Sequence, residues 1–227
     1  MLKTGSLKNF YSIGALINMF FVAKTPAILK WVYPSCIWNI PNNNNAVFLT
    51  FDDGPTNLVT EQVLTILEKE GAKATFFCVG SQIEKNPALF QKIIDKGHAI
   101  GNHTFNHLNG WKTNRYDYFN NIDRCQKLTS SSLFRPPYGK ITSAQIKKLK
   151  KQYKIIMWDV AGGDFLSDIS CEKIVKNVVD NTSSGSIIVL HDNIKFGDKM
   201  LKALPKLINQ LKDKGFVLER IPNDVTD

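Results

Sequence analysis

Two adjacent aspartates, Asp52 and Asp53, are the first residues of this chain that indicate chemistry. They directly follow the strand-like run 47–51 and directly precede Gly54-Pro55. Neighbouring carboxylates repel each other, and a buried strand end makes the repulsion stronger because such surroundings screen charge poorly. A bound cation would offset this repulsion, so the pair predicts a metal site.

Two histidines, His103 and His107, supply the other ligands that such a site needs. They are four residues apart, so one helical turn or a tight strand-to-helix turn would point both rings the same way. Neutral imidazoles bind borderline divalent metals, and two of them with one carboxylate leave coordination positions open for catalysis. One aspartate of the pair would bind the metal, and the other would be free to act as a base.

Arg135 and His191 are candidates for the remaining chemical roles. Arg135 precedes a stiff double proline, and its guanidinium can orient and neutralise a carboxylate; a solvated arginine in a surface turn is the alternative. His191 follows the apolar run 186–190 and could protonate a leaving nitrogen, whereas a core histidine is the simpler possibility. Asp159 and Asp164 are candidate carboxylate partners for that histidine.

The elements that must position these residues alternate along the chain. Strands are predicted at 47–51, 74–79, 98–102, 133–135, 155–160, 186–190 and 216–219, and helices at 58–70, 87–96, 116–129, 142–151, 170–180 and 199–214. This alternation predicts an α/β barrel or a doubly wound sheet.

The position of the polar residues decides between these two folds. The candidate residues fall at the C-terminal ends of predicted strands: Asp52, Asp53, His103, Arg135, Asp159, His191 and Asp192. Such ends converge on one face of an α/β barrel, where active sites lie. Because 227 residues are few for eight βα units, we expect a distorted, incomplete (β/α) barrel of about seven parallel strands.

The asparagine-rich linker 41–45 divides the chain into an N-terminal segment, 1–45, and a catalytic domain, 46–221. Lys3 and Lys8 precede the apolar run 10–23, which predicts a signal peptide, peripheral or anchored membrane association, or a packed local helix.

The net charge of +9 comes from basic residues spread along the chain, apart from one cluster at 147–151. That cluster is typical of a solvated helix face, and attraction to anionic polymers is the weaker interpretation. No nucleic-acid motif accompanies it, so we expect no nucleic-acid partner. We also expect a monomeric protein.

Five stretches, in this order, resemble the motifs of the polysaccharide deacetylase family, also called the NodB-homology domain or carbohydrate esterase family four. They are TFDDGP at 50–55, HTFNH at 103–107, RPPYG at 135–139, DF at 164–165 and LHD at 190–192. The resemblance spans about 47–216 and implies one divalent metal ion, with zinc expected first and cobalt, manganese or nickel as alternatives. It also implies removal of N-acetyl, or O-acetyl, groups from an acetylated glycan such as peptidoglycan, a chitin-like glycan or exopolysaccharide.

The resemblance assigns roles to individual residues. It implies that the metal ligands are Asp53, His103 and His107. It implies that Asp52 is the base oriented by Arg135, that His191 is the acid tuned by Asp164, and that the Tyr138 N–H stabilises the oxyanion.

The residues expected to line the substrate groove are Pro137, Tyr138, Phe165 and Leu190, although a core position is the simpler interpretation for Leu190. Phe165 stands where the family usually has tryptophan, so it keeps an apolar wall but loses an N–H donor.

Two other functions stay open at this point. One is a non-catalytic carbohydrate-binding protein on the same scaffold, which a missing ligand, base or acid would favour. The other is a non-haem iron enzyme, since two histidines and one carboxylate also bind iron. The substrate class favours a cell-envelope or exported location, and a cytoplasmic location stays open.

Overall fold

The computed structural model describes residues 21–225, so the apolar run 10–23 lies outside the described residues except for its last three members. In the described part of the chain, no helix is long and apolar enough to cross a bilayer.

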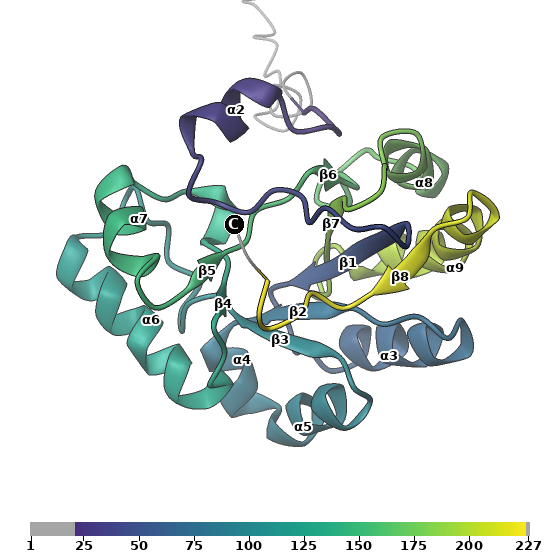
Figure 1. Ribbon diagram of the computed structural model, residues 1–227. Helices are drawn as coiled ribbons and strands as arrows, with labels where there is room; N and C mark the ends of the chain where they lie inside the picture. The colour runs from purple at the N-terminus through teal and green to yellow at the C-terminus, as the bar shows by residue number, and fades with distance from the viewer. Residues whose placement is uncertain (1–20, 226–227) are drawn as a thin grey trace, which may run out of the picture.

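The central feature is a curled parallel sheet with the strand order β5-β4-β3-β2-β1-β7-β6, while β8 pairs with β1 beside this path (Figure 1). The strands are β1 (Ala46–Asp52), β2 (Thr75–Cys78), β3 (Ala99–Asn102), β4 (Leu133–Phe134), β5 (Lys154–Ile155), β6 (Val160–Ala161), β7 (Ile187–His191) and β8 (Val217–Glu219). β1 is buried along its whole length, as an unbroken apolar run in a parallel sheet should be. The sheet confirms the predicted incomplete (β/α) barrel.

Helices surround the strands on the outside of the barrel (Figure 1). They are α2 (Ala27–Val32), α3 (Val59–Lys69), α4 (Gly80–Lys85), α5 (Pro87–Asp95), α6 (Arg115–Thr129), α7 (Ser143–Leu149), α8 (Cys171–Val179) and α9 (Gly197–Asp213), with a 3-10 turn η1 (Pro137–Gly139). The predicted cap at Thr142 is present, because its side chain accepts a hydrogen bond from the Gln145 N–H in a capping box. The α4 helix was not predicted; it has six residues and begins with glycine, so its sequence carries little helical signal.

The predicted strand 155–160 is wrong in one respect: the structure divides it into β5 and β6, at opposite edges of the sheet. The chain leaves β4 once Ile156 has donated its N–H to the Phe134 carbonyl, and it joins β7 at Val160. Asp159 therefore precedes a strand instead of ending one, and its side chain does not join the polar cluster at the strand ends. Apolar continuity reveals burial but not the hydrogen-bonding partner, which is why the sequence pattern missed this division.

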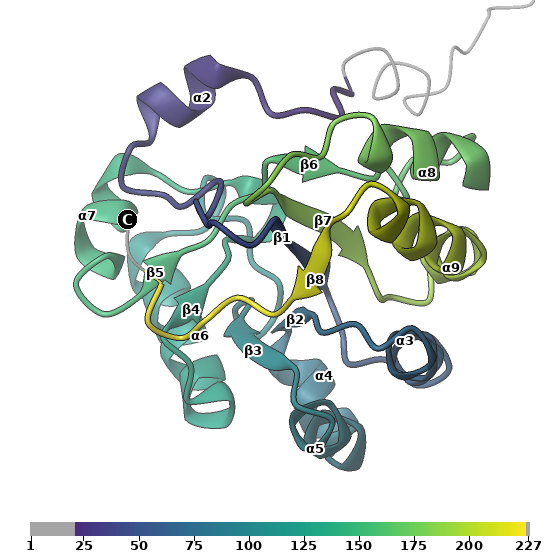
Figure 2. The ribbon, with the colours of Figure 1, turned by 45° about the vertical axis from the view of Figure 1, so that its right-hand side comes forward.

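The N-terminal segment covers the seam between these two edges (Figure 2). Isolated bridges join Ile37 to Ile156, Lys24 to Val160 and Asn39 to Ser186. The described part of the segment thus packs on the barrel, while the division of the chain at 45/46 stays a prediction.

Candidate active site and metal centre

The C-terminal ends of β4, β3, β1 and β7, with β2 between β3 and β1, bring the predicted residues together. Asp52 is the last residue of β1 and is in register with His191, the last residue of β7. His103 directly follows β3 and donates its backbone N–H to the Cys78 carbonyl at the end of β2. The Arg135 N–H, just after β4, bonds to the carbonyl of Asn102. These parallel strands therefore deliver a carboxylate, two histidines and an arginine to one face.

Asp53, His103 and His107 form a cluster with the donor set of a metal site. Their ligand atoms all lie within 4.8 Å of one another. Asp53 Oδ1 lies 3.0 Å from His107 Nε2 and 3.7 Å from His103 Nε2. This oxygen is buried, and in the described part of the chain no side chain donates a well-aligned hydrogen bond to it, although His107 Nε2 lies close. An unsatisfied carboxylate oxygen facing two imidazole nitrogens fits a borderline divalent cation, which would accept all three lone pairs.

Electrostatics keep the Asp53 carboxylate charged. Burial alone would raise its pKa, but the contact with His107 and the positive charge of His191 lower it well below its usual range. Asp53 also adopts a left-handed backbone with φ of 83°, as do His107 at 56° and Tyr138 at 60°. Such conformations are strained for residues other than glycine and cluster at functional sites.

The hydrogen bonds of His103 select one tautomer. Its Nδ1 lies 2.8 Å from the backbone carbonyl oxygen of Arg135, which can only accept a hydrogen bond. Nδ1 therefore carries the proton, and Nε2 offers its lone pair toward Asp53. Burial lowers the pKa of His103 to about 4, against the opposing charge of Asp52, so the ring is neutral near pH 7. A neutral ring with a free Nε2 is the form that binds a metal ion.

Asp52 has a different environment from its neighbour. Arg135 Nη1 donates to Asp52 Oδ1 at 2.7 Å and to Thr50 Oγ1 at 2.6 Å. The fully buried guanidinium also bonds to the carbonyls of Ile156 and Met157 and lies 4.0 Å above the Phe77 ring. Arginine stays protonated even when buried, so the carboxylate beside it has a fixed counter-charge.

His191 is held by a second buried carboxylate. Asp164 Oδ1 lies 3.0 Å from His191 Nδ1, and Asp164 Oδ2 accepts the backbone N–H of His191 at 2.7 Å. Burial alone would lower the pKa of His191, but the charge and hydrogen bond of Asp164, with Asp53 and Asp52, raise it to about 9. The imidazolium can therefore persist at neutral pH and carry a proton for transfer.

Two residues that the sequence interpretation left without a role support the metal cluster. Asp192 is buried and accepts hydrogen bonds from the Gly54 N–H at 3.0 Å and the Thr60 hydroxyl at 2.6 Å. Asn193 donates from Nδ2 to Asp53 Oδ2, and its own Oδ1 accepts the Phe196 N–H. Asn193 thereby occupies one oxygen of Asp53 and leaves Oδ1 facing the two histidines. The only signal in the sequence is that both residues directly follow His191 at a strand end.

The expected groove residues differ in their exposure. Tyr138 is exposed, and its hydroxyl lies 3.1 Å from His107 Nδ1. Phe165 is partly buried, with its ring 5.6 Å from that of His191. Pro137 is buried in η1, and Leu190 is fully buried in the main core, which agrees with the simpler interpretation of Leu190.

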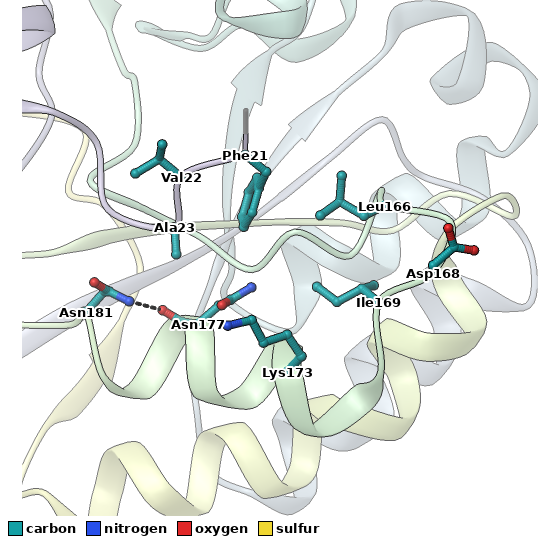
Figure 3. A pocket seen from close by; sticks show the side chains of 9 residues that line it. All are labelled: Phe21, Val22, Ala23, Leu166, Asp168, Ile169, Lys173, Asn177 and Asn181. Atoms are coloured by element: carbon teal, nitrogen blue, oxygen red, sulfur yellow. Dashed lines mark hydrogen bonds between the residues drawn. The ribbon is translucent and has the colours of Figure 1, made fainter. Parts of the chain in front are cut away.

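A separate pocket of about 490 Å³ lies between the N-terminal segment and α8 (Figure 3). Its lining residues are Phe21, Val22, Ala23, Leu166, Asp168, Ile169, Lys173, Asn177 and Asn181. None of the residues assigned to chemistry is among them, so this pocket is not the catalytic centre.

The fold and the site together define an incomplete (β/α) barrel in which a buried carboxylate, Asp52, and a histidine, His191, flank a His-His-Asp cluster. The chain also matches the family model for polysaccharide deacetylase over residues 39–155, and it belongs to this family. Membership confirms the resemblance seen in the motifs. It also confirms the expected class, a hydrolase acting on carbon–nitrogen bonds other than peptide bonds.

Characterised relatives are similar over most of the chain. A Bacillus cereus peptidoglycan-N-acetylglucosamine deacetylase is 36% identical over 187 residues, covering 79% of this chain and 87% of that protein. A chitooligosaccharide deacetylase of Azorhizobium caulinodans is 31% identical, covering 81% of this chain and 96% of that protein. The solved structure of the Bc1960 peptidoglycan N-acetylglucosamine deacetylase, bound to 4-naphthalen-1-yl-N-oxidanyl-benzamide, superposes with a TM-score of 0.81 at 35% identity. That match covers 87% of this chain and 95% of the solved chain.

Proposed function

We propose that this protein removes the acetyl group from N-acetylglucosamine units of a glycan, with peptidoglycan or a chitin-like glycan as the substrate class. The observation that carries the proposal is that the neighbouring carboxylates Asp52 and Asp53 have different partners. Asp52 is bonded to Arg135, whereas Asp53 turns its unsatisfied Oδ1 toward His103 and His107. The names of the relatives in Bacillus cereus and Azorhizobium caulinodans support this substrate class.

Asp53, His103 and His107 would hold one divalent metal ion, with zinc as the expected ion and cobalt, manganese or nickel as alternatives. When bound there, such an ion polarises the acetyl carbonyl and lowers the pKa of a water molecule. Asn193 supports the site by fixing the orientation of the Asp53 carboxylate.

Asp52 acts as the general base. Its carboxylate accepts a proton from the attacking water while the water oxygen forms a bond with the acetyl carbon. Arg135 holds Asp52 Oδ1, which leaves Oδ2 on the side that faces His103 at 3.9 Å. The backbone N–H of Tyr138 would donate to the carbonyl oxygen as negative charge develops there.

His191 acts as the general acid. Its protonated ring gives a proton to the sugar nitrogen as the carbon–nitrogen bond breaks, so the products are acetate and a free amine. Asp164 keeps the ring oriented through Nδ1, and the other ring nitrogen is left to carry the transferred proton. An O-acetyl ester would need less help from this acid, because an alkoxide leaves more readily than an amide nitrogen. We therefore favour N-acetyl over O-acetyl substrates.

Acetate release from a panel of acetylated glycans tests the proposal, using enzyme stripped with a chelator and reloaded with zinc, cobalt or manganese. The expected result is metal-dependent release from N-acetylated sugars. Glycan binding without acetate release under every metal would instead support the alternative, a non-catalytic carbohydrate-binding protein.

A further inference from the structure

The α2 helix presents an apolar face to the outside of the protein. Ile28 is 60% exposed, Trp31 77% and Val32 49%, and their spacing of i, i+3 and i+4 places them on one face. Leu29 and the nearby Val22 are also exposed. This short stretch thus holds five of the twelve large exposed hydrophobic residues in the described part of the chain. A local gathering of this kind marks an interaction surface.

The orientation of α2 is fixed by charges on its inner side. Lys30 and Lys24 each place Nζ 2.6 Å from a carboxylate oxygen of Asp159, which is buried and also accepts the Ser186 hydroxyl. The Thr25 N–H adds a backbone bond to the Asp159 carbonyl. The helix is therefore inverted relative to an ordinary surface helix, because its charged side chain points inward and its apolar side chains point outward.

A basic rim adjoins this apolar face. The exposed lysines at the C-terminal end of α7 and just beyond it are Lys147, Lys148, Lys150 and Lys151. Lys150 Nζ lies 3.4 Å from the hydroxyl of Ser35, three residues after α2 ends. In both views α2 lies above the barrel and α7 lies next to it at the left (Figures 1 and 2). Lys150 thus brings this basic cluster next to the segment that follows the apolar α2 helix.

The sequence that precedes α2 also combines apolar residues with lysines. The apolar run 10–23 follows Lys3 and Lys8, and α2 begins at Ala27, four residues after the run ends. An extended chain spans at most about 3.5 Å per residue. The last residue of the run, Ala23, therefore lies within roughly 15 Å of the start of α2.

We propose that the α2 face, formed by Ile28, Trp31 and Val32, is a docking surface for an anionic lipid bilayer. Tryptophan and aliphatic side chains would enter the boundary between headgroups and acyl chains, and the α7 lysines would contact lipid phosphates. A bilayer fits better than a protein partner because apolar side chains occur together with lysines twice. They do so at α2 with the basic rim, and again in the run 10–23 with Lys3 and Lys8 before it. The proposal does not depend on the catalytic activity.

Partition of the full chain onto vesicles tests this surface. We would use vesicles of equal parts phosphatidylglycerol and phosphatidylethanolamine and compare the wild type with Ile28→Ser/Trp31→Ser/Val32→Ser. The partition coefficient of the triple variant should fall by at least about tenfold, because it lacks the three apolar side chains that would enter the bilayer. The matched control, Ile94→Ser/Tyr116→Ser/Val217→Ser, removes exposed apolar groups elsewhere and should stay within about twofold of the wild type.

Quenching by brominated lipids separates docking of α2 from tethering by the N-terminal run alone. Of the four tryptophans, Trp31 and Trp111 are the exposed ones. We expect Trp31→Phe to remove most of the quenching of bound protein and Trp111→Phe to leave it unchanged.

Three results would overturn the proposal: no binding of the wild type, equal binding of the Ile28/Trp31/Val32 variant, or quenching that survives Trp31→Phe. An unchanged melting temperature of that triple variant confirms that its fold is intact, as its exposed positions lead us to expect.

Discussion

Arg135 Nη1 lies 2.7 Å from Asp52 Oδ1, and both side chains are buried where β4 and β1 end. The neighbouring Asp53 makes no such pair and faces His103 and His107 instead. Two carboxylates that are adjacent in sequence thus have two different sets of partners: a charged guanidinium for Asp52 and two imidazoles for Asp53. This difference in environment supports the proposed roles of Asp52 as the base and of Asp53 as the metal ligand.

Replacing Arg135 should reduce both stability and activity. In Arg135→Met the buried Asp52 carboxylate loses its partner, and breaking a buried ion pair costs about 3–5 kcal/mol of unfolding free energy. Arg135→Lys keeps the charge but cannot reach Asp52 and the carbonyls of Ile156 and Met157 together. We expect it to lose roughly tenfold or more in kcat. Denaturant unfolding and acetate-release assays measure the two effects. A wild-type kcat in Arg135→Lys would show that the simultaneous hydrogen bonds of the planar guanidinium are unimportant.

Asn193→Ala should weaken metal binding. Without the Asn193 amide the Asp53 carboxylate can rotate, and loss of such a supporting hydrogen bond lowers metal affinity by about 10–100-fold. Competition with a chromophoric chelator measures the dissociation constant directly. Asn44→Ala, which removes an exposed contact with Glu219, is the matched control and should bind metal normally. Equal affinities for the two variants would refute the supporting role of Asn193.

Asp164→Asn should move the alkaline limb of the pH–rate profile to lower pH. The acid form of His191 is present below its raised pKa of about 9 and is lost as the pH rises through that value. Removing the Asp164 charge lowers this pKa, so the acid form disappears earlier. The raised pKa of His191 also predicts how the fold's stability depends on pH. The stabilisation that the Asp164–His191 pair gives the folded state is complete below about pH 6.5 and is lost as the pH rises through about 9. If the alkaline limb of kcat/KM stayed at the wild-type pH in Asp164→Asn, the role of His191 as the general acid held by Asp164 would be contradicted.

Gly54→Ala should destabilise the turn that carries Asp53. A Cβ at Gly54 would lie 2.1 Å from Asp192 Oδ2, so the carboxylate that binds the Gly54 N–H would have to move. We expect a loss of about 2 kcal/mol or more in unfolding free energy, together with weaker metal binding. Gly71→Ala is the control: no atom lies within 4 Å of its Cβ, so its positive φ of 58° should cost only about 1 kcal/mol. Similar stability losses for the two variants would rule out the collision as the cause.

The sequence predicted the barrel, and it named residues that the fold brings together at the strand ends, because the informative patterns are local. Strand ends and the spacing of His103 and His107 can be recognised within a few neighbouring residues. The contacts that escaped prediction join distant positions, such as Asn193 with Asp53, 140 residues apart, and Lys24 with Asp159, 135 apart. No local pattern marks such pairs, since the fold alone brings them together. The division between β5 and β6 escaped prediction for the same reason.

Asp52→Asn compared with Asp53→Asn is the most direct test of the central claim. Metal content by elemental analysis and acetate release from an N-acetylglucosamine oligomer would be measured on the same samples. We predict that Asp52→Asn retains its metal while acetate release falls by about 10²–10⁴-fold, and that Asp53→Asn loses both. Undiminished acetate release by Asp52→Asn, or loss of metal from that variant alone, would contradict the division of labour between these neighbouring aspartates.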